Sequence, residues 1–250
     1  MLSNNELKFL RSLKQKKIRK EYRCFIVEGT KSVWEVLHSD FKVKAVYATP
    51  QWAEQHPKFH HDIHLVSEKE CEQISALTTT PHIFALVEMP EQQPVFSASD
   101  HPKILLLDDV KDAGNFGTII RTADWFGIDA LVCSENTVEL YNPKTLQASM
   151  GSFTRVPVFR FDLLNFVQEH ADSYTFFGTY MEGENIRNVD FPQNCAVVLG
   201  NESFGISPQL SAEIKNRISI PMCENKGRRH AESLNVSLAA AVVCYEVGGQ

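Results

Sequence analysis

Short, continuous runs of apolar residues constrain the fold of this chain most strongly. ILLL at 104–107 and AVVL at 196–199 contain no polar residue, and they are followed by Asp and by Gly. Parallel strands covered by helices on both faces have this character, whereas half-exposed strands alternate apolar and polar residues. Segments of helical periodicity separate such runs throughout 103–250. The sequence therefore predicts an α/β fold with a parallel sheet in this part of the chain.

The first ninety residues predict a smaller α/β domain. We expect strands at 24–29, 43–48, 63–67 and 83–89, and helices at 6–21, 30–39, 50–55 and 67–77. The stretch 90–102, PEQQPVFSASDHP, is rich in Pro, Ser and Gln and shows no periodicity, as is typical of a linker. The expected organisation is thus a domain at 1–92, a linker at 93–102 and a second domain at 103–250.

Three strings in the second domain place Gly, Asn, Ser or Glu where an apolar run gives way to a turn. They are NFGTIIRTADWFG at 115–127, VVLGNESFGIS at 197–207, and ISIPM with ESLNVSLAAA at 218–241. Ligands of parallel α/β sheets bind beyond the carboxyl ends of the strands. We therefore expect the three strings to converge on one ligand site.

The first string has the chemistry of a phosphate clamp. A helix is expected over 117–126, and Arg121 lies one helical turn after Gly117. A guanidinium near a helix start can bind phosphate with two parallel hydrogen bonds. The alternative is an ordinary surface ion pair between Arg121 and Asp124, which would contribute little.

The other two strings combine polar side chains with turn residues. Gly200 and Gly205 bracket Glu202 at a strand end, where backbone can approach a ligand closely. A helix is expected from about Ser233, with Ser233 as its N-cap. Asn235 would then lie in the first turn without a capping role, which favours a functional one.

Charge is distributed unevenly along the chain. The net charge is -6, yet residues 1–31 contain nine Lys or Arg against three Glu. Lysine and arginine bind polyanions by displacing counterions from phosphates, so this arm predicts RNA binding, with a solvated helix face as the alternative. The candidate RNA-binding residues are Lys16, Lys17, Arg19, Lys20 and Arg23, together with Arg228 and Arg229.

Composition favours a cytoplasmic protein without metal. The six cysteines stand singly, with no C-x-x-C pair, and are expected to be reduced and mostly buried. No apolar run approaches the roughly 20 residues of a membrane span. The histidines at 56, 60, 61 and 64 are interpreted as a polar loop, because Pro57 interrupts them and no Cys or paired carboxylate lies nearby.

The motifs N-x-G-x-x-x-R-x-A, LGNE-x-x-G and IPM followed by SLNVS resemble, in this order, the three motifs of the SpoU/TrmH family of RNA ribose 2'-O-methyltransferases. The resemblance covers roughly 103–250 and includes ASMGSFTRVPV at 148–158. KKIRKEYRCFIVEGTKSVWEVL at 16–37 resembles the ribosomal-protein-like RNA-binding domain that precedes the catalytic domain in many members.

The resemblance implies a C-terminal trefoil knot that binds S-adenosyl-L-methionine, and a homodimer formed through the knotted domain. Knots are nearly absent from proteins, so pattern alone does not predict one. The family's catalytic positions match Asn115, Arg121, Glu202, Ser233 and Asn235. Its cofactor-binding positions match Leu199, Gly200, Asn201, Gly205, Ile220, Met222 and Leu234.

The expected activity is S-adenosylmethionine-dependent 2'-O-methylation of a ribose in structured RNA, with ribosomal RNA ahead of transfer RNA. Family accounts make the Arg matching Arg121 the base, but guanidinium is essentially always protonated, so a phosphate clamp is the other interpretation. The stretch CENKGRRHAE at 223–232 is longer than the family's turn, which leaves open a non-catalytic RNA-binding or ribosome-assembly protein with the same fold. A base-methylating relative is a third alternative.

Overall fold

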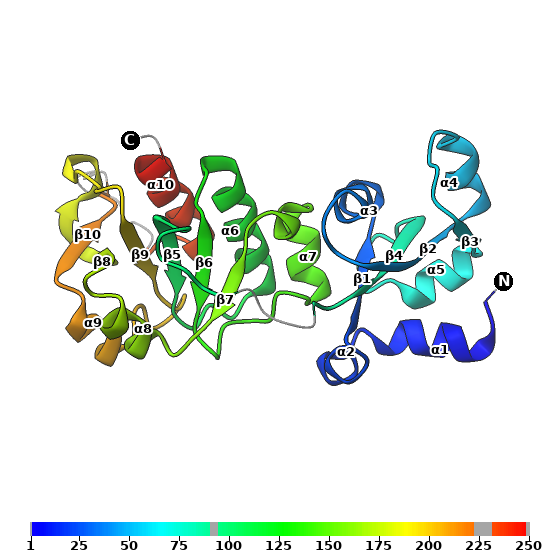
Figure 1. Ribbon diagram of the computed structural model, residues 1–250, viewed down its shortest axis with the longest axis horizontal. Helices are drawn as coiled ribbons and strands as arrows, with labels where there is room; N and C mark the ends of the chain where they lie inside the picture. Colours follow the sequence, from blue (N-terminus) through cyan, green and yellow to red (C-terminus); the bar gives the residue numbers. More distant parts are fainter. Residues whose placement is uncertain (1, 91–94, 223–231, 249–250) are drawn as a thin grey trace. The chain divides into compact units, whose positions relative to one another are not determined.

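The computed structural model describes residues 2–90, 95–222 and 232–248 (Figure 1). The chain forms two compact units. One comprises Met1–Gln93 with Glu139–Arg155, and the other comprises Pro94–Val138 with Val156–Gln250. The segment Glu139–Arg155 thus packs with the N-terminal unit, whereas the sequence suggested that it belongs to a domain at 103–250.

The first unit is built on a four-stranded sheet of order β1-β4-β2-β3, in which only β2 and β3 are parallel. The predicted strands are confirmed within one or two residues. They are β1 (Cys24–Glu28), β2 (Val43–Ala48), β3 (Ile63–Leu65) and β4 (Ile83–Glu88). The helices are α1 (Asn4–Ser12), α2 (Lys16–Tyr22), α3 (Thr30–Leu37), α4 (Pro50–Gln55), α5 (Glu68–Ile74) and α7 (Pro143–Ser149), with the 3-10 turn η1 (Ser152–Thr154).

The prediction of a single helix over 6–21 is wrong, because a short non-helical connection separates α1 from α2. Leu13 is fully buried there, and the guanidinium of Arg19 donates to the carbonyl oxygens of Leu13 and Lys14 over 2.8 and 2.7 Å. The last carbonyls of α1 accept from the backbone amides of residues 13–15, while Arg19 satisfies the two carbonyls that follow the helix. Hydrophobic periodicity does not register such a contact.

Aromatic packing joins the segment Glu139–Arg155 to β1. The ring of Phe25 stacks on that of Tyr141 with centroids 4.4 Å apart, and it meets Phe153 edge to face at 6.3 Å. Phe25 is fully buried. Offset and edge-to-face ring pairs stabilise a core beyond the area they bury. This part of the unit is therefore a true core formed by residues distant in sequence.

The second unit contains the predicted parallel sheet. Its order is β10-β8-β9-β5-β6-β7, and every neighbouring pair is parallel, which confirms the α/β class. The strands are β5 (Lys103–Leu107), β6 (Ala130–Cys133), β7 (Val158–Arg160), β8 (Thr175–Asn185), β9 (Cys195–Leu199) and β10 (Asn216–Ser219). The 3-10 turn η2 (Ile186–Asn188) follows β8.

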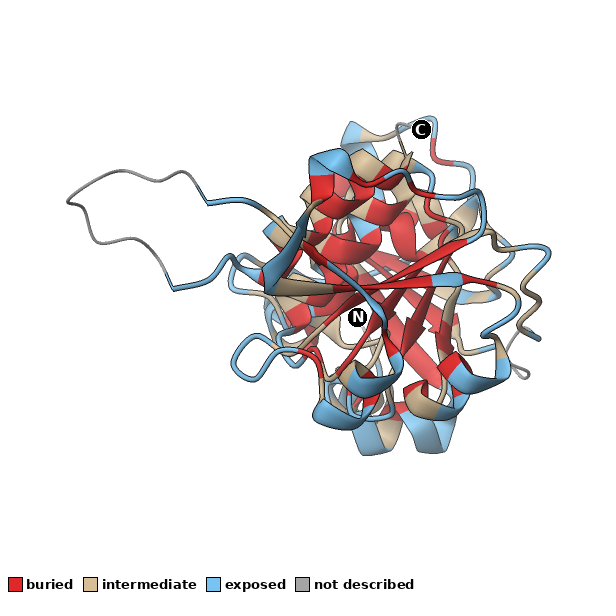
Figure 2. Ribbon diagram, turned by 90° about the vertical axis from the view of Figure 1, so that its left-hand side faces the viewer, coloured by how far each residue is buried: buried red, intermediate tan, exposed pale blue. Residues whose placement is uncertain are grey.

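Helices cover both faces of this sheet, as the apolar strands require. The helices α8 (Leu163–Glu169) and α9 (Pro208–Glu213) share one core with alternate residues of β5, β6 and β9. The helices α6 (Ala113–Phe126) and α10 (Val236–Gly248) pack on each other, and α10 also contacts β9 (Figure 1). Figure 2 shows the buried residues concentrated in the strands. The trefoil knot stays a prediction.

Candidate active site

The site begins where β5 and β9 end. These strands are neighbours, and Leu107 is the register partner of Leu199. Because both strands run in the same direction, the segments that follow them leave the sheet at the same edge. The amide of Asp108 donates to the carbonyl of Leu199 over 2.9 Å, and the carboxylate of Asp108 accepts from the amide of Ser207 over 2.7 Å. The first two strings therefore lie side by side.

The helix α6 starts at Ala113, so its expected start at Gly117 is wrong. Asp112 is the N-cap, and its carboxylate accepts from the amide of Asn115 over 2.8 Å. Aspartate is a strong N-cap because it satisfies an amide that has no partner within the helix. Asn115 accordingly lies in the first turn of α6 rather than in a preceding loop. The capping signal of Asp112 was visible in the sequence but was missed.

A tight turn after β9 presents Glu202. The backbones of Asn201 and Gly205 exchange two hydrogen bonds of 2.9 Å. Gly205 has φ of 71°, a left-handed conformation that favours glycine. A Cβ on Gly200 would lie 2.1 Å from the carbonyl carbon of Gly205. The turn thus leaves no room for a side chain at Gly200, and it favours glycine at Gly205.

Asn201 stabilises the same turn with its side chain. Its amide nitrogen donates to the carbonyl of Asp109 over 2.8 Å, and its oxygen accepts from the amides of Ser203 and Phe204. Leu199 is buried, and its carbonyl is already bonded to Asp108. Both residues thus help to hold this turn, and their assignment to the cofactor site stays a prediction.

A hydrogen-bonded chain links all three strings. The amide nitrogen of Asn115 donates to the carboxylate of Glu202 over 3.1 Å, and the oxygen of Asn115 accepts from the amide nitrogen of Asn235 over 3.0 Å. The amide group of Asn115 thus donates to one partner and accepts from another. The convergence predicted for the three strings is what the structure shows for these three residues.

Asn235, not Ser233, caps α10. The helix begins at Val236, and the oxygen of Asn235 accepts from the amide of Ser237 over 2.9 Å. The expectation that Ser233 is the N-cap is therefore wrong, and so is the idea that Asn235 lies within the first turn. Ser233 is exposed just before the helix. Two capping residue types close together made the boundary ambiguous in the sequence.

Arg121 is exposed on α6, two turns after the helix start. Within the described parts of the chain, the guanidinium of Arg121 has no hydrogen bond or ion pair. The surface ion pair with Asp124, considered as the alternative, is therefore not formed. Ile220 is half-buried, while Met222 and Leu234 are 58% and 52% exposed. These apolar side chains are available to a ligand.

The candidate RNA-binding residues divide into two groups. Lys16, Lys17, Lys20 and Arg23 are exposed. Arg19 is only 2% exposed and bonds to Glu139, so its assignment to an RNA surface is wrong. A buried guanidinium already neutralised by a carboxylate cannot displace counterions from phosphate. Arg228 and Arg229 lie outside the described residues.

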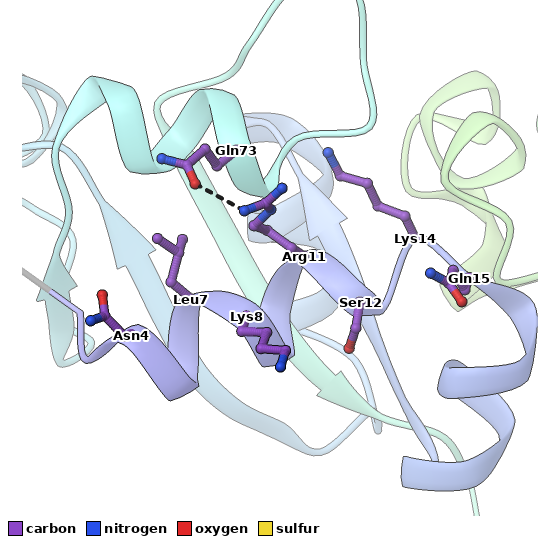
Figure 3. Close-up of a pocket in the computed structure, with 8 residues that line it drawn as sticks. All are labelled: Asn4, Leu7, Lys8, Arg11, Ser12, Lys14, Gln15 and Gln73. Carbon is purple, nitrogen blue, oxygen red and sulfur yellow. Dashed lines mark hydrogen bonds between the residues drawn. The ribbon is translucent and has the colours of Figure 1, made fainter.

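A basic groove of about 600 Å³ lies along α1 in the first unit. Figure 3 shows Arg11 reaching Gln73 of α5, with a hydrogen bond of 3.2 Å. Lys8 and Lys14 also line it, and none of its described lining residues is acidic. The sequence shows these cations but gives no sign of the groove, because α5 is distant along the chain. Its lining residues are Asn4, Leu7, Lys8, Arg11, Ser12, Lys14, Gln15 and Gln73.

The described cysteines are free and buried, as expected for them. They are Cys24, Cys71, Cys133, Cys195 and Cys244, while Cys223 lies outside the described residues. Burial raises the pKa of Cys133 to about 12. Among residues 2–90, 95–222 and 232–248, no group of three His, Cys, Asp or Glu side chains could hold a metal ion. The helices within these ranges lack the combination of length and apolar character that a membrane-spanning helix needs.

Comparison with known proteins defines the class to which this fold and site belong. The model of the SpoU rRNA Methylase family matches residues 102–245, and that of the MRM3-like substrate binding domain matches residues 4–85. The chain belongs to the SpoU rRNA Methylase family, as the three motifs predicted.

Individual relatives support this assignment along the whole chain. The 23S rRNA (guanosine(2553)-2'-O)-methyltransferase RlmP of Bacillus subtilis is 31% identical over 98% of this chain and 97% of its own. The structure of a putative RNA methyltransferase of the TrmH family from Porphyromonas gingivalis has a TM-score of 0.85 and 33% identity, covering 99% of this chain and 98% of that one. An AdoMet-bound rRNA methyltransferase from Sinorhizobium meliloti has a TM-score of 0.82 and 28% identity, with 99% and 95% covered.

Proposed function

We propose that this protein transfers a methyl group from S-adenosylmethionine to the 2'-hydroxyl of a ribose in structured RNA, and that this RNA is ribosomal. The hydrogen bonds that connect Glu202, Asn115 and Asn235 carry the proposal. They join three segments at one sheet edge in a member of an RNA methylase family. The Bacillus subtilis relative is named for 2'-O-methylation of 23S rRNA. Transfer RNA is the alternative substrate, since other relatives are named tRNA/rRNA methyltransferases.

The residues beyond β9 and β10 fit the cofactor. Exposed apolar side chains of Met222 and Leu234 suit an adenine ring, while the bend at Gly200 brings backbone amides and carbonyls close to a ligand. The proposed set is completed by Leu199, Asn201, Gly205 and Ile220. When bound, S-adenosylmethionine supplies a methyl group activated by a sulfonium, so the chain itself must mainly position the hydroxyl.

The proposed reaction is a direct displacement. S-adenosylmethionine, held beyond β9 and β10, would supply the methyl group to the ribose O2', and its sulfur would leave with the electron pair of the broken carbon–sulfur bond. Arg121 binds the phosphate beside the ribose and stabilises the charge that develops on O2'. The hydroxyl proton leaves to phosphate or water, with a transiently neutral Arg121 as the alternative acceptor. Glu202, Ser233 and Asn235 orient the hydroxyl and Arg121.

Substitution of Arg121 separates the two roles. Arg121→Lys keeps the positive charge, so a clamp that acts through charge alone retains measurable methyl transfer. Complete loss of activity would instead favour a role in bidentate hydrogen bonding or as a base. A lysine ammonium lacks the planar geometry of a guanidinium and differs from it in acidity. Affinity for S-adenosylmethionine, measured by calorimetry, reports whether the substituted protein is still intact.

RNA substrate is proposed to dock on the groove of Lys8, Arg11 and Lys14, together with the exposed Lys16, Lys17, Lys20 and Arg23. The match of residues 4–85 to a substrate binding domain and the basic character of the described lining residues support this. In the double variant Lys8→Gln/Lys14→Gln, RNA affinity should fall, and the slope of log affinity against log salt should drop by about one for each phosphate that is no longer bound. Lys42→Gln/Lys58→Gln, on exposed lysines outside the groove, is the matched control.

A homodimer is proposed to form through the exposed face of α6 and α10. Trp125 is 82% exposed, and Leu238 and Tyr245 are also largely exposed. Large apolar side chains on two packed helices favour burial against a second copy. Light scattering should give twice the chain mass, and Trp125→Glu should reduce it to the monomer.

The trefoil knot and a cytoplasmic location are further parts of this proposal, the latter supported by the bacterial relatives.

A methyl-transfer assay tests the function directly. Purified protein, radiolabelled S-adenosylmethionine and RNA from cells that lack this protein should give a labelled 2'-O-methyl nucleoside after digestion. Ribosomal and transfer RNA are assayed separately, so the result also decides the substrate class. If calorimetry at millimolar S-adenosylmethionine detects no binding, the protein is a non-catalytic RNA-binding protein and the proposal fails.

A further inference from the structure

The turn that holds Glu202 also presents a fully projecting aromatic ring. Phe204 is 89% exposed, although an isolated phenyl group in water gains nothing for the fold. Single exposed apolar residues are common on protein surfaces and need no explanation by themselves. The position of Phe204, two residues from Glu202 at the meeting point of the three strings, is what requires one.

The backbone of this turn is held in place on several sides. The amide of Phe204 donates to the side-chain oxygen of Asn201 over 3.2 Å, and Asn201 is tied to the carbonyl of Asp109. The paired backbones of Asn201 and Gly205 close the turn. The backbone that carries the ring is therefore already ordered. It loses little conformational entropy when a ligand contacts the ring.

We infer that Phe204 is a substrate-binding residue that stacks on an unpaired base of the RNA, at or next to the nucleotide whose ribose is methylated. This inference rests on the proposed function. A ribose hydroxyl can enter a site at a sheet edge only if its nucleotide is accessible, and RNA bases in loops and bulges are commonly splayed out and stacked on aromatic side chains. Every base has a π-face, so the contact adds affinity without fixing the base identity.

The inference narrows the substrate to RNA in which the target lies in a loop, bulge or other unpaired segment. Stacking on one base changes affinity by roughly 5- to 150-fold on alanine substitution. Phe204→Ala should therefore lower kcat/KM for ribosomal RNA by at least about fivefold, mainly through KM. Phe204→Tyr and Phe204→Trp should retain activity, whereas Phe204→Leu should behave like Phe204→Ala, because leucine is apolar but cannot stack.

Three readouts complete the experiment. Methyl transfer to ribosomal RNA from cells lacking this protein gives kcat and KM. Calorimetry gives the affinity for S-adenosylmethionine, and light scattering gives the oligomeric state. Met181→Ala, another exposed apolar side chain of the same unit, is the control that should leave all three unchanged. A short single-stranded oligonucleotide containing 2-aminopurine adds a direct probe, because stacking quenches its fluorescence.

Each outcome has a distinct meaning. Aromatic rescue with unchanged cofactor affinity and oligomeric state supports the inference. Equal activity of Phe204→Ala and the unsubstituted protein overturns it. The inference also fails if Phe204→Ala loses affinity for the cofactor or changes its oligomeric state and Phe204→Leu does not. In that case the side chain at 204 would contact the cofactor or a second copy of the protein. Failure of the unsubstituted protein to methylate any RNA would instead overturn the proposed function itself.

Discussion

Arg19 and Glu139 are 120 residues apart in sequence and form a buried ion pair within the first unit. The Nε of Arg19 donates to Glu139 Oε1 over 2.7 Å, and the two side chains are 3% and 14% exposed. The same guanidinium donates to the two carbonyls that directly follow α1. One side chain thus stabilises the break between α1 and α2 and the attachment of the segment Glu139–Arg155.

Removal of Glu139 should destabilise the first unit strongly. Glu139→Ala leaves a buried guanidinium without its carboxylate, and breaking a buried pair by removing one partner costs about 3–5 kcal/mol. Urea unfolding followed by tryptophan fluorescence measures this, since Trp34 and Trp52 lie in the same unit. Glu35→Gln weakens the more exposed pair with Arg155 and should cost about 1 kcal/mol or less. Equal effects of the two variants would contradict the assignment.

Substitution of Asn115 should reduce catalysis more than folding. Asn115→Ala removes both hydrogen bonds that connect Glu202 and Asn235, so both side chains lose their orientation, and a small misplacement can lower kcat about 100-fold. Asn115→Asp should be at least as severe, because a carboxylate cannot donate to Glu202. Steady-state methyl transfer measures the loss. Asn165→Ala, an exposed asparagine on α8, should be neutral, and a neutral Asn115→Ala would contradict the role of the bridge.

The two glycines of the turn after β9 should respond differently to alanine. In Gly200→Ala the added carbon would overlap the backbone of Gly205 and Ile206, so the turn must open, and affinity for S-adenosylmethionine should fall at least about tenfold. Gly205→Ala meets no atom within 4 Å and adds only the strain of a positive φ, roughly 1–2 kcal/mol. Calorimetry on both variants checks the order, and a tighter-binding Gly200→Ala would refute it.

The buried thiols should be inert in the folded protein. Burial raises the pKa of Cys133 and Cys244 to about 12 and that of Cys71 and Cys195 to about 11. The thiolate is the nucleophile, so at about pH 8 its population is negligible in the folded state and grows only as the pH approaches these values. Alkylation mapped by peptide mass spectrometry should modify these four positions only after unfolding. Modification of any of them under native conditions would contradict the burial.

Local properties of the sequence were sufficient for much of the fold. The runs at 104–107 and 196–199 are apolar throughout because helices cover both faces of the sheet, so they predicted parallel strands correctly. The polar residues that follow such strands necessarily lie at one sheet edge, so the convergence of the strings on Asn115 was also predictable. Helix boundaries were less certain, since Asp112, Ser233 and Asn235 are all competent caps.

The tertiary structure alone decided which polar groups are available. Arg19 belongs by sequence to a basic arm, yet a carboxylate 120 residues away buries it, whereas Arg11 lines an open groove. The side chain of Asn201 bonds to Asp109, and Phe204, three residues further on, projects into solvent. Strand burial and helix capping depend on neighbours within a few residues, but the burial of a charge or an amide depends on a partner that only the folded chain brings near.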